Sequence, residues 1–143
     1  MLFSRHFWRS DIVGSKVMRK KIVFIINPIS GTIKKDEIPL MISEEIDADL
    51  FDITILHTEY RGHGCELARN YLEKGYDYIV AVGGDGTVNE VAREIIHSTA
   101  SLGIVPIGSG NGLARHMNIP MNPRKAIAQI NHSESILIDY GIV

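Results

Sequence analysis

A glycine-rich stretch around a single acid, Gly83-Gly84-Asp85-Gly86-Thr87, follows a buried-type apolar run and precedes a helical pattern. Glycines at a strand-to-helix junction let a ligand approach the backbone closely. The helix that follows directs its free N–H groups and the positive end of its dipole at the same place. This arrangement is suited to phosphate, and Asp85 would repel phosphate unless a hard cation such as Mg²⁺ intervenes or the carboxylate handles a proton.

The start of this helix also has a purely structural interpretation. Thr87-Val88-Asn89-Glu90 fits a capping box, in which Thr87 and Glu90 satisfy the free N–H groups of the helix reciprocally. A run of three glycines around an acid is more than a turn requires, so the ligand-binding interpretation extends beyond these two residues.

Two further loops have similar chemistry. The loop "GSGNG" (108–112) follows the apolar run "LGIVPI", and the loop "NPISG" (27–31) follows the first apolar run. Ser109 can donate to a phosphate oxygen, and Asn111 can both donate and accept. Taken alone, either loop could be a simple glycine-rich turn.

Short apolar runs alternate with helical patterns from residue 22 onward. Consecutive Ile and Val residues predict strands covered on both faces. The alternation predicts a three-layer α/β fold with a mostly parallel open sheet, Rossmann-like and with right-handed crossovers. The expected strands are 22–27, 51–56, 76–82, 102–107 and 135–141, and the expected helices are about 36–47, 63–74, 87–97, 111–117 and 123–131.

In such sheets a ligand binds at the carboxyl ends of the strands. The loops at that edge follow Ile26, Leu56, Val82 and Ile107, and three of the four are rich in glycine and small polar residues. This convergence predicts the binding site more strongly than any single motif does.

Composition limits the other function classes. A net charge of −2 over 143 residues gives no indication of a nucleic-acid partner, and no apolar run approaches the length of a membrane span. Cys65 is the only cysteine, which excludes an internal disulfide and predicts a cytoplasmic setting. Residues 1–17 lack the apolar core of a signal peptide, and we expect them to be an extension or flexible arm before a domain over 18–143.

Competing motifs are absent. The chain has no G-x-x-x-x-G-K-[ST], no G-x-G-x-x-G and no G-x-S-x-G, and its six histidines lack metal-binding spacing. Backbone amides with a magnesium ion are then the means left for holding phosphate.

The segments "NPISG", "GGDGTVNEV" and "GIVPIGSGNGLARHMNIP", in this order, resemble the catalytic domain shared by diacylglycerol kinases, sphingosine and ceramide kinases and bacterial lipid kinases. The resemblance covers about residues 20–143. NAD kinases and phosphofructokinases share GGDG alone, but the continuation T-V-N-E-V and the two flanking motifs are specific. The fold implied is that of the N-terminal domain of NAD kinases and diacylglycerol kinases.

The resemblance implies an ATP site used with Mg²⁺. Asp85 would be essential for phosphoryl transfer, acting through the metal or through the acceptor hydroxyl, and Ser109 would close the site. Thr58 would reach the phosphates, and the segment from Gly84 to Glu90 would wrap them. The implied nucleotide-binding set is Asn27, Gly31, Thr58, Gly83, Gly84, Asp85, Gly86, Thr87, Asn89, Glu90, Ser109 and Asn111.

Two departures from the family pattern affect the acceptor. Gly112 stands where many bacterial members have Asp, and we expect the β-rich C-terminal domain that carries lipid contacts at the membrane surface to be absent. The chain would then be incomplete for phosphorylating a lipid such as diacylglycerol or a sphingoid base. An NAD-kinase-like enzyme and a non-catalytic nucleotide-binding module are the alternatives, and a homodimer remains open.

Overall fold

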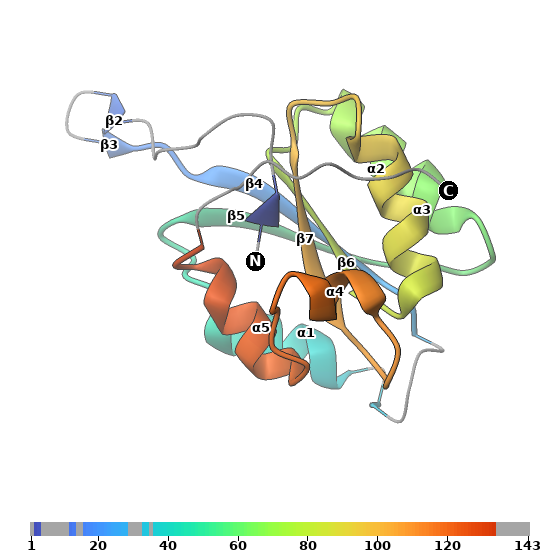
Figure 1. Ribbon diagram of the computed structural model, residues 1–143. Helices are drawn as coiled ribbons and strands as arrows, with labels where there is room; N and C mark the ends of the chain where they lie inside the picture. Colours follow the sequence, from blue (N-terminus) through green and yellow to red (C-terminus); the bar gives the residue numbers. More distant parts are fainter. Residues whose placement is uncertain (1, 4–11, 14–15, 29–32, 35, 134–143) are drawn as a thin grey trace.

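The computed structural model describes residues 2–3, 12–13, 16–28, 33–34 and 36–133 (Figure 1). The predicted strand over 135–141 lies outside these residues. The elements, in chain order, are β1 (Leu2–Phe3), β2 (Ile12–Val13), β3 (Lys16–Val17), β4 (Lys20–Ile26), α1 (Glu37–Glu45), β5 (Phe51–His57), α2 (His63–Glu73), β6 (Tyr78–Gly83), α3 (Asp85–Ile95), β7 (Ser101–Pro106), α4 (Gly112–His116) and α5 (Pro123–Ile130).

The main sheet has the strand order β1-β7-β6-β4-β5, in which β7, β6, β4 and β5 are parallel and β1 is antiparallel to β7. Ile26 is in register with His57 on one side and with Val82 on the other. The carboxyl ends of these three strands therefore meet at one edge. The predicted α/β fold with a mostly parallel sheet is confirmed.

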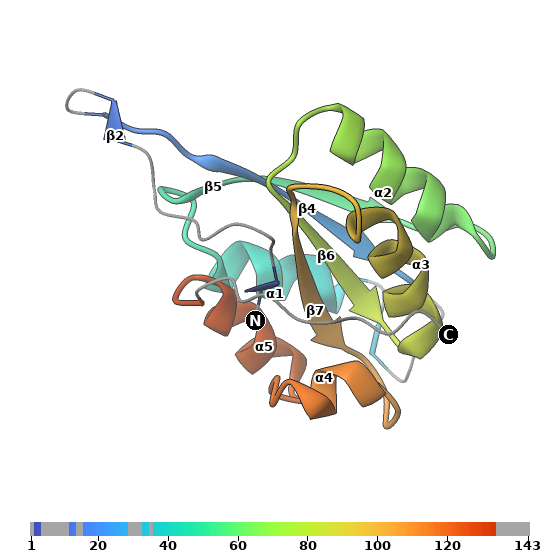
Figure 2. The ribbon, with the colours of Figure 1, turned by 45° about the horizontal axis from the view of Figure 1, so that its top comes forward.

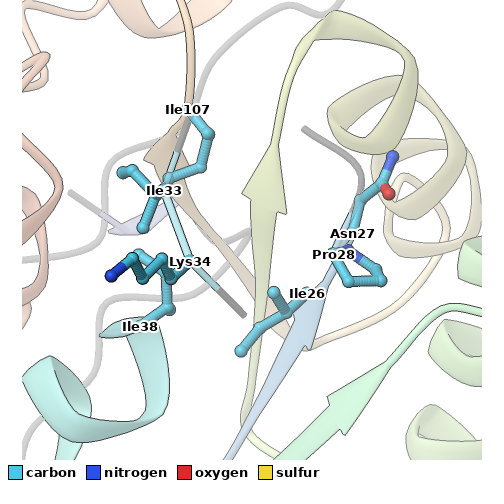
Figure 3. A pocket seen from close by; sticks show the side chains of 7 residues that line it. All are labelled: Ile26, Asn27, Pro28, Ile33, Lys34, Ile38 and Ile107. Carbon is cyan, nitrogen blue, oxygen red and sulfur yellow. The ribbon is translucent and has the colours of Figure 1, made fainter. Parts of the chain in front are cut away.

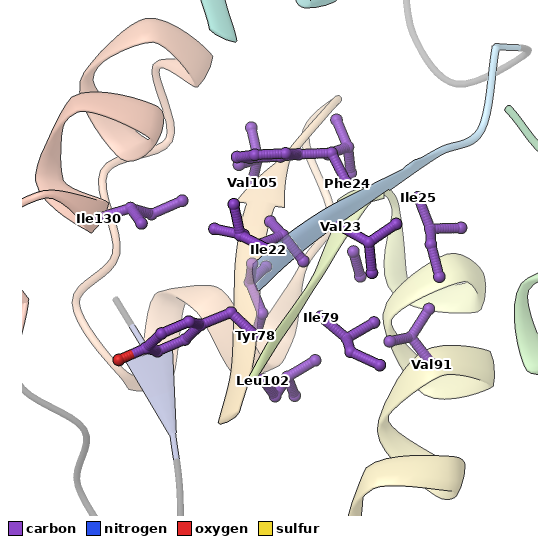
Figure 4. Close-up of a cluster of buried hydrophobic side chains, with 14 of the residues drawn as sticks. Ile22, Val23, Phe24, Ile25, Tyr78, Ile79, Val91, Leu102, Val105 and Ile130 are labelled. Carbon is purple, nitrogen blue, oxygen red and sulfur yellow. The ribbon is translucent and has the colours of Figure 1, made fainter. Parts of the chain in front are cut away.

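Helices cover both faces of the sheet (Figures 1 and 2). Helices α1 and α5 pack on one face, and α2 and α3 pack on the other, which gives three layers. Every residue of β6 and β7 is buried, whereas β5, at the edge of the sheet, is mostly half-buried. Figure 4 shows side chains of the central strands packed together in the core, such as Ile22, Val23, Phe24 and Ile79.

The two strands that follow β4 in the chain, β5 and β6, lie on opposite sides of it in the sheet, and this arrangement determines where a ligand can bind. It passes from β4 through α1 to β5 on one side of β4, and later returns through α2 to β6 on the other side. The loops after β4 and β6 thus lead to helices on opposite faces of the sheet. Such a switch point opens a crevice at the carboxyl ends of the two strands.

The segment predicted as an N-terminal extension contributes to the sheet at one point. Leu2 pairs with Gly103 and Phe3 with Leu102, so β1 lies along β7. Strands β2 and β3 pair with each other in a separate two-stranded sheet. Among the described residues, none of the helices has the length and apolar character required to cross a membrane.

Candidate functional site

The loops after β4, β5, β6 and β7 are joined by hydrogen bonds at the switch point. The backbone N–H of Asn27 donates to the Val82 carbonyl at 3.0 Å, and that of Thr58 donates to the Ile26 carbonyl at 2.8 Å. The backbone N–H of Ile107 donates to the Gly83 carbonyl at 3.0 Å. These bonds hold the points where the four predicted loops begin at one edge of the sheet.

Helix α3 begins at this edge without a side-chain cap. Its N-cap residue, Gly84, has an extended backbone (φ −89°, ψ −168°) and makes no capping hydrogen bond. The alternative capping box is not formed: Thr87 is already inside the helix, where it is buried and accepts a hydrogen bond from Asn27 Nδ2 at 3.3 Å. In the part of the chain that the structure describes, the first-turn N–H groups of α3 have no side-chain acceptor, as an anion site requires.

Asp85 caps a different helix. Its Oδ2 accepts the backbone N–H of Asn111 and its Oδ1 accepts that of Gly112, both at 2.9 Å, at the start of α4. A Cβ on Gly110 would lie 2.8 Å from Asp85 Oδ2, so only glycine permits this close approach. The side chain is exposed, and each oxygen retains a lone pair with which to face a cation.

Asn111 links the two glycine loops. It is fully buried, has a left-handed backbone (φ 69°), and donates from Nδ2 to the Gly83 carbonyl at 2.7 Å. Asparagine tolerates this conformation better than most residues. The side chain is thus part of the framework between the loops.

Arg115 stabilises the same loop from α4. Its Nη2 donates to the Ser109 carbonyl at 2.8 Å and its Nε to the Gly110 carbonyl at 3.1 Å. The sequence prediction did not include Arg115. The position of Arg115 in "LARHM", directly after the glycine loop, could have indicated this role. A guanidinium group beside a turn can donate hydrogen bonds to the exposed carbonyls of that turn.

Glu90 also caps a neighbouring helix. Its Oε1 accepts the backbone N–H of Gly62 at 2.9 Å, and its Oε2 accepts that of Gly64 at 3.1 Å, at the start of α2. Gly62, the N-cap residue of α2, has φ 90°, a conformation that favours glycine. Both acids of the "GGDGTVNE" stretch, Asp85 and Glu90, therefore cap helices other than α3, the helix to which they belong.

A cavity of about 330 Å³ lies between the loop after β5 and the first turns of α3. This volume is in the range of small-molecule sites. The cavity is lined by Asn27, Thr58, Glu59, Tyr60, Arg61, Gly86, Thr87 and Glu90. Five of the predicted residues are brought together here, while Glu59, Tyr60 and Arg61 were missed although the loop "HTEYRGHG" itself was singled out.

Tyr60 lies at this cavity with its ring held in place. It stacks on His63 with ring centroids 4.4 Å apart and an interplanar angle of 10°, and its hydroxyl donates to Glu66. That hydrogen bond, with smaller contributions from burial and nearby carboxylates, raises the pKa of the Tyr60 hydroxyl above its ordinary value.

The remaining predicted residues lie apart from the cavity. Ser109 and Asn111 are on the loop after β7, next to Asp85, and none of these three lines the cavity. Asn89 is exposed on α3, and Gly31 lies outside the described residues. The structure thus divides the predicted site into a cavity group and an Asp85 group.

A second hollow lies beside Asn27, on the α1 side of the sheet (Figure 3). Its walls are mainly the isoleucines 26, 33, 38 and 107, and it encloses only about 10 Å³, which is room for about one water molecule. The Asn27 side chain turns away from it toward α3. The larger cavity is therefore the candidate site.

The described residues fit a magnesium–triphosphate group. A Cβ on Gly86 would meet nothing within 4 Å, so the backbone of the first turn of α3 is open to a ligand. No group of three or more His, Cys, Asp or Glu side chains suited to a metal ion occurs in the described part of the chain. One carboxylate at Asp85 matches Mg²⁺, which proteins often hold through one or two carboxylates together with substrate phosphates.

Comparison with known proteins places this site in a family. The model of the diacylglycerol kinase catalytic domain matches residues 21–143. The protein named diacylglycerol kinase from Staphylococcus saprophyticus subsp. saprophyticus is 34% identical over 127 residues, covering 87% of this chain and 41% of that protein. The one from Staphylococcus aureus (strain JH9) is 32% identical over 127 residues, covering 87% of this chain and 40% of that protein.

Solved structures agree with the sequence comparison. A crystal structure described as a diacylglycerol kinase from Bacillus anthracis strain Sterne matches with a TM-score of 0.69 and 28% identity, covering 82% of this chain and 41% of that chain. Another crystal structure from the same organism matches with a TM-score of 0.72 and 29% identity, and the match covers 82% of this chain and 42% of that chain.

The sheet and its covering helices define a three-layer α/β domain of the diacylglycerol kinase fold. The chain belongs to the diacylglycerol kinase catalytic domain family. It spans about two fifths of the length of the curated relatives it matches.

Proposed function

We propose that this chain is the nucleotide-binding part of a lipid kinase that transfers the γ-phosphate of ATP to a lipid hydroxyl. Its curated relatives are named diacylglycerol kinase, and the chain corresponds to about two fifths of their length. In this proposal the remaining length of such proteins supplies the lipid contacts. Diacylglycerol or a sphingoid-like lipid is the acceptor.

One observation supports this proposal above the others. The N-terminus of α3 has no side-chain cap and lies at a cavity on the switch point of the sheet. The two acids of its first turns, Asp85 and Glu90, accept N–H groups of α4 and α2 instead. With no side-chain acceptor for them among the described residues, the N–H groups and helix dipole of α3 are available to an external anion.

When bound, Mg-ATP supplies the phosphoryl group, and the metal neutralises charge on it. The first turn of α3, from Gly84 to Thr87, holds the phosphate chain with backbone N–H groups. Thr58 faces the same cavity from the loop after β5. Asp85 is fixed in orientation by its two backbone N–H donors, and its remaining lone pairs would be available to hold the metal or to accept the proton of the acceptor hydroxyl.

Titration calorimetry of the full chain with Mg-ATP tests this site. We expect Gly84→Val to weaken binding by at least tenfold, because its side chain would enter the space beside the α3 amides. The backbone of Gly84 is extended with a negative φ, so the position does not demand glycine, and a Cβ there comes no nearer than 4.0 Å to the Ile107 carbonyl. Asp85→Ala is expected to weaken binding of Mg-ATP more than binding of ATP in EDTA.

Asp49→Ala, at an exposed position near the amino end of β5, serves as the control and should leave both affinities unchanged. Absence of Mg-ATP binding to the unaltered chain would refute the proposal, as would native affinity in folded Gly84→Val. Displacement of ATP by NAD would instead favour a kinase acting on a soluble dinucleotide. A labelled-phosphate assay with diacylglycerol in mixed micelles tests whether the chain transfers phosphate without further sequence.

A further inference from the structure

Helix α3 begins at the cavity, and α2 begins directly after the loop that lines it; of these two helices, only α2 has a side-chain acceptor at its start among the described residues. The start of α2 is occupied by the Glu90 carboxylate, which accepts the N–H groups of Gly62 and Gly64. The start of α3 has no side-chain acceptor within the described ranges of the chain. An anion in the cavity therefore finds its donors at α3, and the α2 end is already neutralised.

The loop between β5 and α2 is anchored at both ends. At its first residue, the Thr58 N–H donates to the carbonyl of Ile26 at the end of β4. At its last, the Gly62 N–H donates to Glu90. Residues 59–61, between these anchors, line the cavity. The contact to Glu90 thus sets the position of the loop relative to α3.

The fit at this anchor is close enough to require glycine. A Cβ on Gly64 would lie 2.6 Å from Glu90 Oε2 and 3.3 Å from Glu90 Cβ. Gly64 is buried, so its N–H has no alternative acceptor in water when the carboxylate is removed. The Cys65 thiol donates to the Glu90 carbonyl at 3.2 Å, which draws the same turn of α2 toward α3.

We infer that Glu90 is a positioning residue that fixes the Thr58–Arg61 loop against α3, and that it contributes to nucleotide binding through this loop and not as a ligand to the phosphates. The inference rests on the proposed function for its effect on nucleotide affinity. The contact itself can be tested without nucleotide.

Glu94 offers a matched control. It lies one turn further along α3 and also joins α3 to α2, through Arg69 with Nη2 and Oε1 2.9 Å apart. It does not line the cavity. Glu94→Ala therefore removes an acidic link between the same two helices and leaves the loop anchor intact.

The experiment compares the unaltered chain with Glu90→Ala, Glu90→Gln, Gly64→Ala and Glu94→Ala. In ¹H–¹⁵N spectra without nucleotide, Glu90→Ala should shift the Gly62 and Gly64 amide signals and accelerate their hydrogen exchange, whereas Glu94→Ala should not. In calorimetry with Mg-ATP, Glu90→Ala and Gly64→Ala should each weaken binding on the order of tenfold. Glu90→Gln, which keeps one acceptor oxygen, should recover part of that loss, and Glu94→Ala should bind as the unaltered chain does.

Gly64→Ala disturbs the contact from the other side, so it replaces Glu90→Ala if that variant does not fold. Unshifted Gly62 and Gly64 signals in Glu90→Ala would overturn the inference, as would equal affinity losses in Glu90→Ala and Glu94→Ala. If the unaltered chain does not bind Mg-ATP while the amide signals respond as expected, the proposed function fails and the loop anchor stands.

Discussion

Replacing Gly86 by alanine should stabilise the fold and weaken nucleotide binding. Gly86 is the second residue of α3, it lines the cavity, and a Cβ there meets nothing within 4 Å. Alanine restricts the unfolded chain and favours helix, which is worth about 0.5–1 kcal/mol relative to glycine. For a chain of this size the melting temperature should rise on the order of 2–4 °C.

The same methyl group occupies the approach to the first turn of α3. If phosphate is held there by backbone N–H groups, the added atom displaces it, and we expect the Kd for Mg-ATP to rise by about tenfold, equivalent to about 1.4 kcal/mol. Thermal unfolding followed by circular dichroism, together with titration calorimetry, measures both effects on one sample.

Asn70→Ala provides the comparison for Gly86→Ala. Asn70 is exposed on α2 and does not line the cavity, and alanine there also improves helix propensity by a few tenths of a kcal/mol. It should raise stability and leave the Kd unchanged. A folded, stabilised Gly86→Ala that binds Mg-ATP with native affinity would contradict the placement of phosphate at α3.

Two further predictions concern stability and thiol chemistry. Asp85→Ala should lower the free energy of unfolding by about 1 kcal/mol, because two N–H groups at the start of α4 lose their acceptor. Urea titration measures this change, and an unchanged unfolding midpoint would argue against the cap. Burial, followed by the charge of Glu90, raises the pKa of the Cys65 thiol above its ordinary value of 9.0. Its thiolate fraction at pH 8 should be smaller than that of a free cysteine, so labelling by a disulfide reagent should be slow in the folded chain and accelerate on unfolding or above pH 9. The pKa of the Cys65 thiol is higher in the folded chain than in the unfolded chain. The contribution of the protonated thiol to folding stability is therefore complete below pH 9, and it is lost as the pH rises through the folded-state pKa.

The sequence predicted the elements well because their signals are local. Apolar runs such as that of β6 and helical spacing such as that of α3 arise from neighbouring residues, and the observed bounds lie within two residues of those expected for both. The glycine loops could be assigned to the carboxyl edge for the same reason, since a parallel sheet places every strand-to-helix loop there.

The individual side-chain roles required the tertiary structure. The local pattern from Thr87 to Glu90 matched a capping box, yet Thr87 pairs with Asn27 and Glu90 with Gly62 and Gly64. Such donors are 26 or more residues away in the sequence, and their approach depends on how α2, α3 and the sheet pack.

The sequence by itself determined an α/β domain with a glycine-rich loop around Asp85 at the carboxyl edge of its sheet. Only the tertiary structure decided that both acids of this stretch accept N–H groups from neighbouring helices, while no side chain of the described residues caps α3. The physical reason is that a carboxylate binds whichever unsatisfied N–H groups the packing brings within reach, and sequence spacing predicts only those on its own helix.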